Sequence, residues 1–170
     1  MSFSFLPTLI TPKLTDLTAQ QLRLRGIQLL MMDFDNTIVP YTTSIPTAEM
    51  DQWLRTMVQS EIKLCVVSNS KRDRVKVFCN QYGIDCITHS KKPFPKGIRQ
   101  CLNKYRIAPE CCALVGDQIF TDTMGANGCN VTSILVEAID NHNIWLKLRH
   151  VAELPFIFLA RKRRINYDQH

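Results

Sequence analysis

Two carboxylates stand one residue apart where an apolar segment ends. Asp33 and Asp35 follow residues 27–32 and begin the string Asp-Phe-Asp-Asn-Thr. Carboxylates held close together can bind a divalent cation through their oxygens, and they can divide the roles of nucleophile and general acid/base. An acidic residue after a strand can also form a turn or cap a helix. That second interpretation accounts for one aspartate but not for the whole string.

Polar residues follow three later apolar segments in the same way. These segments span residues 62–67, 84–88 and 112–115. The candidate residues after them are Ser68 and Asn69, then Lys92, and then Asp117 and Asp122. A single lysine or serine is usually a solvated surface residue, and Asp122 could simply cap a following helix. Polar residues at the end of every segment indicate one common site instead.

The elements that must position these residues alternate between strands and helices. Five apolar segments predict strands, the fifth at residues 131–136, and helices are expected near 46–60, 71–82 and 96–106 and from residue 122 onward. This alternation predicts an α/β fold of three layers, in which helices cover both faces of a mainly parallel five-stranded sheet. The carboxyl ends of parallel strands lie along one edge of a sheet, where ligands bind. The candidate residues should therefore converge at that edge.

The chain length of 170 residues suits a single domain. We expect an N-terminal arm and helix at residues 1–26, a core at about 27–136 and a C-terminal segment at 143–170. The formal net charge of +6 favours an anionic partner: a phosphorylated metabolite, a nucleic acid or an anionic membrane surface.

Cysteine usage and hydropathy bear on the compartment. The seven cysteines include no Cys-x-x-Cys pair, which argues against a zinc site and favours free thiols in a reducing environment. We find no secretory signal and no apolar stretch of membrane-spanning length, so a cytoplasmic protein is expected. Residues 143–170 combine apolar residues with a basic run. That segment fits a final helix with a solvated tail, and it also fits a peripheral contact with an anionic membrane.

The strand-end motifs resemble those of the haloacid dehalogenase-like (HAD) phosphatases. The first motif is Asp33-Phe34-Asp35-Asn36-Thr37, the second is Ser68, the third is Lys92 in Lys91-Lys92-Pro93 with Lys91 as the other register, and the fourth is Gly116-Asp117 with Asp122. The resemblance covers about residues 27–136. Lys-Lys-Pro-x-Pro-Lys-Gly and Val-Gly-Asp-Gln-x-x-Thr-Asp further resemble the IIIA-type, YqeG-like branch. That branch is similar to the phosphatidylglycerophosphate phosphatases of cardiolipin synthesis.

The resemblance implies a Rossmann-like phosphomonoester hydrolase. Asp33 would attack phosphorus and form an aspartyl-phosphate, and Asp35 would act as general acid and then as general base. Mg²⁺ would be held by Asp33, Asp117 and the backbone carbonyl of Asp35. These three residues are thus the implied metal ligands.

The remaining motif residues receive supporting roles from the same resemblance. Ser68, Asn69 and Lys92 would bind the transferring phosphate, and Lys92 would also compensate its charge. Thr37 would orient the loop of the first motif. Asp122 would hold the metal site or Lys92 in place.

The sequence leaves no room for a large cap domain, because the connections after the first and third strands are short. An uncapped site suits a bulky or surface-bound substrate, and we expect a phospholipid head group, phosphatidylglycerophosphate first. A soluble sugar phosphate, a nucleotide or a nucleic-acid end is the alternative substrate. The basic stretch at residues 71–74 could serve nucleic acid, but it lacks the interleaved aromatics of a stacking platform, so nucleic acid is disfavoured. A non-catalytic binding module on the same fold is the alternative of another class.

Overall fold

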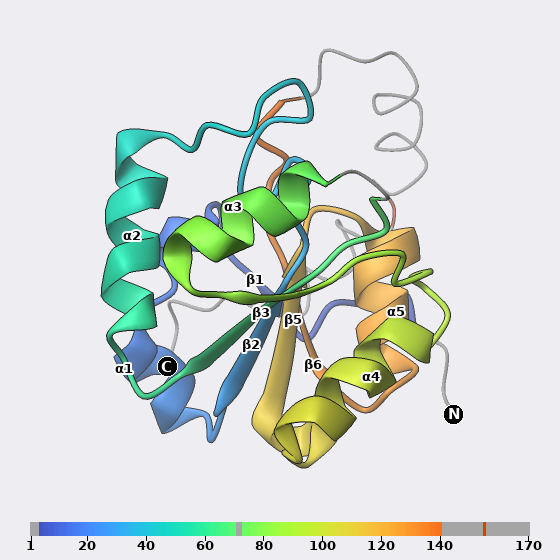
Figure 1. The fold of residues 1–170 in the computed structure, drawn as a ribbon. Coiled ribbons are helices and arrows are strands. Elements are labelled where there is room, and N and C mark those ends of the chain that lie inside the picture. Colours follow the sequence, from blue (N-terminus) through green and yellow to red (C-terminus); the bar gives the residue numbers. More distant parts are fainter. Residues whose placement is uncertain (1–3, 71–72, 141–154, 156–170) are drawn as a thin grey trace.

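One sheet organises the described part of the chain. The computed structural model describes residues 4–70, 73–140 and Pro155. Its sheet has six strands in the order β1-β6-β5-β2-β3-β4, and every pairing is parallel (Figure 1). The strands are β1 (Leu9–Ile10), β2 (Leu29–Met32), β3 (Lys63–Val67), β4 (Asp85–Ile87), β5 (Cys112–Gly116) and β6 (Thr132–Leu135).

The two central strands show why the sheet is parallel. Every residue of β2 and β5 is buried, so both faces of these strands are covered by other parts of the chain, as is typical of parallel sheets. Met32, the last residue of β2, lies opposite Val66 of β3 and Val115 of β5. The three strands therefore end at nearly the same level. The polar residues that follow them emerge side by side along one edge.

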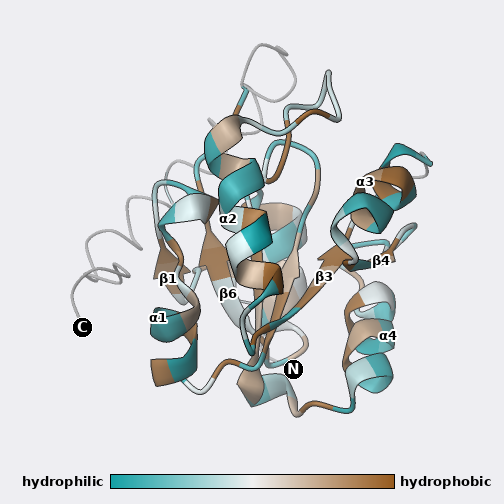
Figure 2. Ribbon diagram, turned by 60° about the vertical axis from the view of Figure 1, so that its left-hand side comes forward, coloured by the Kyte–Doolittle hydropathy of each residue, from teal (hydrophilic) through white to brown (hydrophobic). Residues whose placement is uncertain are grey.

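Helices cover both faces of the sheet, which confirms the predicted three-layer α/β fold. The helices are α1 (Ala19–Leu24), α2 (Ala48–Val58), α3 (Arg74–Tyr82), α4 (Lys96–Tyr105) and α5 (Met124–Asn127). Single turns of 3₁₀-helix occur at Leu14–Asp16 and Pro109–Cys111, and Ile119–Thr123 forms a π-helical turn. Figure 2 shows the apolar strands enclosed by helices whose residues alternate between polar and apolar.

Alternate residues of the strands face different helical layers. Leu30 and Met32 belong to a core that includes apolar residues of α1, α2 and α3, whereas Leu29 and Met31 belong to a second core with α4 and α5. This alternation follows from the two-residue period of a strand. The expected apolar face of α2 is buried, as predicted, and consists of Met50, Trp53, Leu54 and Met57.

The prediction of five strands was wrong by one strand, because the N-terminal arm contributes β1. Leu9 pairs with Ile134 and Ile10 pairs with Leu135 of β6. A two-residue strand is too short to show a period of two in the sequence, and its partner lies more than 120 residues away. Flanking prolines are tolerated at such an edge position, where only one side of the strand needs hydrogen bonds.

The edge at the strand ends carries no large cap domain within the described residues, as expected. The connection from β2 to α2 runs directly from Asp33 to Thr47, and β4 leads to α4 through residues 88–95. Among the residues described, no helix combines the length and the apolar character needed to cross a membrane. The segment 143–170, for which a membrane contact was considered, lies outside the described residues apart from Pro155.

Candidate active site

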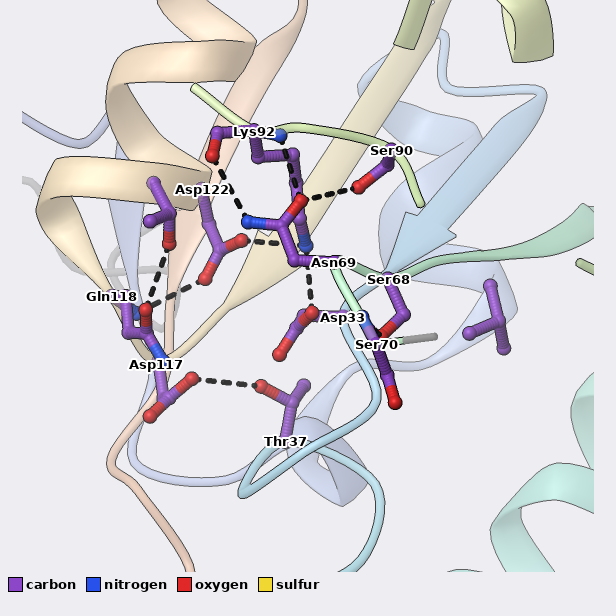
Figure 3. A network of polar contacts seen from close by, with 12 residues as sticks. Asp33, Thr37, Ser68, Asn69, Ser70, Ser90, Lys92, Asp117, Gln118 and Asp122 are labelled. Carbon is purple, nitrogen blue, oxygen red and sulfur yellow. Dashed lines mark hydrogen bonds and ion pairs between the residues drawn. The ribbon is translucent and has the colours of Figure 1, made fainter. Parts of the chain in front are cut away.

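The site centres on a buried lysine between two aspartates. The Nζ atom of Lys92 lies 2.6 Å from Oδ1 of Asp33 and 2.7 Å from Oδ1 of Asp122 (Figure 3). The Lys92 side chain is 1% exposed. Burial by itself lowers the pKa of Lys92, but the charges of Asp122 and Asp33 outweigh burial and raise that pKa above its ordinary value. The ammonium group therefore stays charged beside Asp33.

Asp122 is held by the turn that precedes α5. The backbone N–H of Gln118 donates to Oδ2 of Asp122 at 3.2 Å, and the backbone N–H of Asp122 donates to the carbonyl of Gln118 at 2.9 Å. Burial raises the pKa of Asp122 to about 6, with Lys92 acting in the opposite direction. A side chain at Gly116 would collide with the Asp122 carboxylate, so the glycine makes room for it.

Three carboxylates at this edge fit a divalent cation. One ligand oxygen from each of Asp33, Asp117 and Asp122 lies within 4.8 Å of the other two. Oxygen ligands of this kind suit Mg²⁺, which prefers carboxylates and keeps several waters. The hydroxyl of Thr37 donates to Oδ1 of Asp117 at 3.4 Å, which connects the loop of the first motif to the cluster (Figure 3). The side chain of Asp35 does not belong to this cluster.

Asn69 ties the two loops of the site together. Its Oδ1 atom accepts from the backbone N–H of Lys92 at 2.7 Å and from the hydroxyl of Ser90 at 2.7 Å, and its Nδ2 donates to the carbonyl of Lys92 at 2.9 Å. These bonds use the amide oxygen and one of the two hydrogens on Nδ2, so the expected binding of phosphate by Asn69 stays a prediction. In the structure Asn69 positions the backbone that carries Lys92.

Ser68 lies at the end of β3 and is buried. Its backbone N–H donates to the carbonyl of Ile87, and its Oγ accepts from the backbone N–H of Ser70 at 3.0 Å. Because Oγ acts as an acceptor there, the hydroxyl hydrogen can be donated to another group. Figure 3 shows Ser68 next to Asp33, where a phosphoryl oxygen could receive that hydrogen.

The side chain of Asp35 has a different partner from that of Asp33. Its Oδ1 forms an ion pair with the guanidinium of Arg74, the first residue of α3. The turn after Asp35 is shaped by Asn36, whose φ of 63° is left-handed and whose Oδ1 accepts from the backbone N–H of Tyr41 at 3.1 Å. Asparagine tolerates this conformation better than most residues. The choice of Asn36 in the motif thus has a local structural reason.

Sequence reasoning did not assign Arg74, Ser90 or Gln118 to the site. Arg74 appeared only as part of a basic stretch with a possible nucleic-acid role. A usable signal did exist for Arg74, because the first turn of a helix that follows a strand lies at the same edge as the strand end. Ser90 and Gln118 act through a hydroxyl and a backbone N–H in loops, and the sequence carries no comparable signal for them.

The fold and the site combine a parallel α/β sheet with a buried lysine between two aspartates and a cluster of three carboxylates at the strand ends. The family model for haloacid dehalogenase-like hydrolases matches residues 17–130. The chain belongs to the haloacid dehalogenase-like hydrolase family. The expectations of this superfamily, of its Rossmann-like fold and of an enzyme are therefore confirmed.

Individual relatives agree with this assignment. The chain is 28% identical over 167 residues to "Probable phosphatase YqeG" of Bacillus subtilis, covering 97% of each chain. Among solved structures, a hypothetical protein from Xanthomonas campestris aligns with a TM-score of 0.57 at 15% identity, over 82% of this chain and 79% of that one. The cobalt-bound deoxy-D-mannose-octulosonate 8-phosphate phosphatase of Haemophilus influenzae aligns with a TM-score of 0.52 at 14% identity, over 76% and 77%. At these identities the two structures support the fold alone.

Proposed function

We propose that this HAD-family phosphatase hydrolyses phosphatidylglycerophosphate to phosphatidylglycerol and inorganic phosphate, with Mg²⁺ as cofactor. The lipid substrate rests on one observation, which is that exposed apolar side chains border the open edge where the site lies. They occur in loops that follow β2, β4 and β6, and their exposed fractions are 47% for Tyr41, 76% for Ile45, 69% for Phe94 and 42% for Ile139. We call these four residues the apolar rim.

The apolar rim has a physical meaning beside an anionic site. Apolar groups left in water at a binding edge mark surfaces that meet another apolar phase or partner. A phosphomonoester attached to a lipid stays at the membrane surface, so an enzyme must bring its catalytic edge to that surface. An edge without a cap allows this approach, whereas a closing lid would block it. The net charge of +6 favours an anionic surface as well.

The reaction would proceed in two steps on Asp33. First, a carboxylate oxygen of Asp33 bonds to phosphorus, the bond to the leaving oxygen breaks, and Asp35 gives that oxygen a proton. Then Asp35 takes a proton from a water molecule whose oxygen attacks phosphorus, which releases phosphate and restores Asp33. Lys92 remains beside Asp33 in both steps and compensates the charge of the phosphoryl group.

The other residues of the site would bind the phosphoryl group and the cation. Ser68 would donate its hydroxyl hydrogen to a phosphoryl oxygen. Asp33, Asp117 and the backbone carbonyl of Asp35 would hold Mg²⁺, with Asp122 beside them. When bound, the cation supplies positive charge that neutralises phosphoryl oxygens.

Phosphate release tests the proposal directly. We would measure it from phosphatidylglycerophosphate in mixed micelles and from a panel of soluble sugar phosphates and nucleotides, with Mg²⁺ and with a chelator. Asp33→Asn is the inactive control. Preference for the lipid supports the proposal. Efficient hydrolysis of soluble compounds without lipid turnover would show that the substrate is a soluble phosphomonoester. A wild type that hydrolyses none of these compounds would favour a non-catalytic binding module.

The role of the apolar rim has its own matched test. Ile45 and Leu24 are similarly exposed, at 76% and 79%, but Leu24 ends α1 at the amino-end side of the sheet, away from the site. Ile45→Ser should lower turnover of micellar lipid and leave turnover of a soluble phosphomonoester unchanged. Leu24→Ser should change neither. Equal lipid turnover by the two variants would show that the apolar rim does not contribute to the use of lipid substrate.

A further inference from the structure

Arg74 is held in a specific position beside Asp35. Its guanidinium forms an ion pair with Asp35, and its Nη1 donates to the backbone carbonyl of Thr43 at 2.7 Å. The guanidinium carbon lies 5.2 Å from the ring centre of Phe34 and 5.8 Å from that of Tyr41. The side chains of Arg74 and Asp35 are 16% and 18% exposed. Arg74 thus spans from the start of α3 to the loop of the first motif.

The two cations of the site contact different aspartates of the first motif. Lys92 contacts Asp33, the position at which the phosphoryl group would be transferred. Arg74 contacts Asp35, which would protonate the leaving oxygen. The group attached to that oxygen must depart on the Asp35 side. Arg74 is the cation in contact with the residue that would protonate the leaving oxygen.

The guanidinium retains donor capacity for such a group. A guanidinium has five N–H donors arranged as a planar fork that matches two oxygens of a phosphate or carboxylate. The Nε of Arg74 is buried and has no hydrogen-bond partner within the described part of the chain. Because Nε is buried, a ligand would accept from Nη1 or Nη2, each of which carries two hydrogens and makes one described bond, to Thr43 and to Asp35 respectively.

We propose that Arg74 determines substrate specificity by binding a second negative charge, located on the leaving group of the phosphomonoester. The preferred substrates are then phosphomonoesters whose alcohol carries another acidic group a few bonds away, such as a phosphodiester or a second phosphate. On arrival, the anionic group accepts from the guanidinium in place of Asp35, and the released Asp35 carboxylate takes up a proton from water, which it then gives to the leaving oxygen. This inference rests on the proposed phosphatase function, and phosphatidylglycerol as the leaving alcohol would satisfy it through its phosphodiester.

A pair of soluble substrates isolates this charge. Glycerol 1,3-bisphosphate and glycerol 1-phosphate have the same three-carbon chain and differ in the second phosphate. Wild-type protein should hydrolyse the bisphosphate with the higher kcat/KM. Arg74→Gln should lose about 10- to 100-fold more in kcat/KM on the bisphosphate than on the monophosphate, mainly through KM, because one charge-assisted interaction is removed. Arg74→Lys should restore part of the difference.

The variants separate this role from a structural one. If Arg74 only orients Asp35 or ties α3 to the neighbouring loop, Arg74→Gln lowers turnover of both substrates by the same factor, and the inference is wrong. Arg99 is an exposed arginine of α4, so Arg99→Gln removes the same net charge and should leave the preference intact.

A binding measurement covers the case in which turnover is low or absent. In an Asp33→Asn background with Mg²⁺, calorimetry should show tighter binding of the bisphosphate than of the monophosphate, and Arg74→Gln should abolish the difference. Equal affinities for the two compounds would overturn the inference about Arg74. Failure of the phosphatase proposal is a separate result, recognised by an absence of phosphate release from every phosphomonoester by the wild type.

Discussion

The ammonium of Lys92 lies 2.6 Å from Oδ1 of Asp33 while its side chain is almost completely buried. The contact directs the ammonium group at the carboxylate that would be phosphorylated. The cation is therefore already oriented toward the place where negative charge would develop, and little reorganisation is needed during the reaction. The same contact makes the stability of the protein depend on residues of its site.

Removing Lys92 should cost both stability and turnover. Lys92→Met leaves Asp33 and Asp122 buried and close together without their shared cation, so we expect the free energy of unfolding to fall by about 3–5 kcal/mol. Urea denaturation measures this change. Asp33→Asn keeps the Lys92–Asp122 pair and should abolish turnover while changing stability by only about 1 kcal/mol. A Lys92→Met variant as stable as the wild type would contradict the buried network.

Asn69 should act on turnover through Lys92. Asn69→Ala removes the hydrogen bonds that hold the Lys92 backbone and leaves buried groups without partners, and we expect stability to fall by about 1–3 kcal/mol. The catalytic rate constant should fall as Lys92 loses its position. Ser90→Ala removes only one of these bonds and serves as the milder comparison. An equal loss in both variants would show that the bonds to Lys92 do not matter.

Cation binding should depend on the side chain of Asp117 and not on the side chain of Asp35. We expect Mg²⁺ at about 100 times its dissociation constant to stabilise the protein by about 2.7 kcal/mol, which thermal unfolding can measure. Asp117→Asn should weaken or remove this stabilisation. Asp35→Asn should keep it, because only the backbone carbonyl of Asp35 is a proposed ligand, while phosphate release is lost. Equal loss of stabilisation in the two variants would argue against this ligand set.

Gly116 should be required for the position of Asp122. The added methyl group of Gly116→Ala would meet the Asp122 carboxylate, so we expect a loss of about 1–3 kcal/mol and weaker Mg²⁺ binding. Gly83→Ala is the control, because Gly83 has a φ of 66° and open space around it. That variant should cost about 1 kcal/mol through its backbone and leave Mg²⁺ affinity unchanged.

Stability at high pH should depend on Tyr82. Burial, together with a 2.5 Å hydrogen bond to Asp51, raises the pKa of Tyr82 to about 12 from an ordinary value of about 10. The folded state therefore holds this proton more tightly than the unfolded state. Its contribution is complete below about pH 10 and is lost as the pH rises toward 12. Urea denaturation across this range should show a shallower decline for Tyr82→Phe than for the wild type.

The sequence determined the central strands and the ends at which the motif residues stand. Each of β2, β3 and β5 is a short apolar run buried on most of its length, and such runs are visible without knowledge of their partners. The apolar face of α2 was also visible, because helical spacing places Met50, Trp53 and Leu54 on one side. Local patterns were sufficient for these features, since each depends on residues only a few positions apart.

Only the tertiary structure decided the contacts between segments that are distant in sequence. Strand β1 exists because β6 offers it an edge, and the ion pair of Arg74 with Asp35 joins residues 39 positions apart. The hydrogen bonds of Asn69 likewise depend on the path of the loop that carries Lys92. Such contacts depend on how helices and loops pack around the sheet. That packing cannot be predicted from a residue's type and its immediate neighbours.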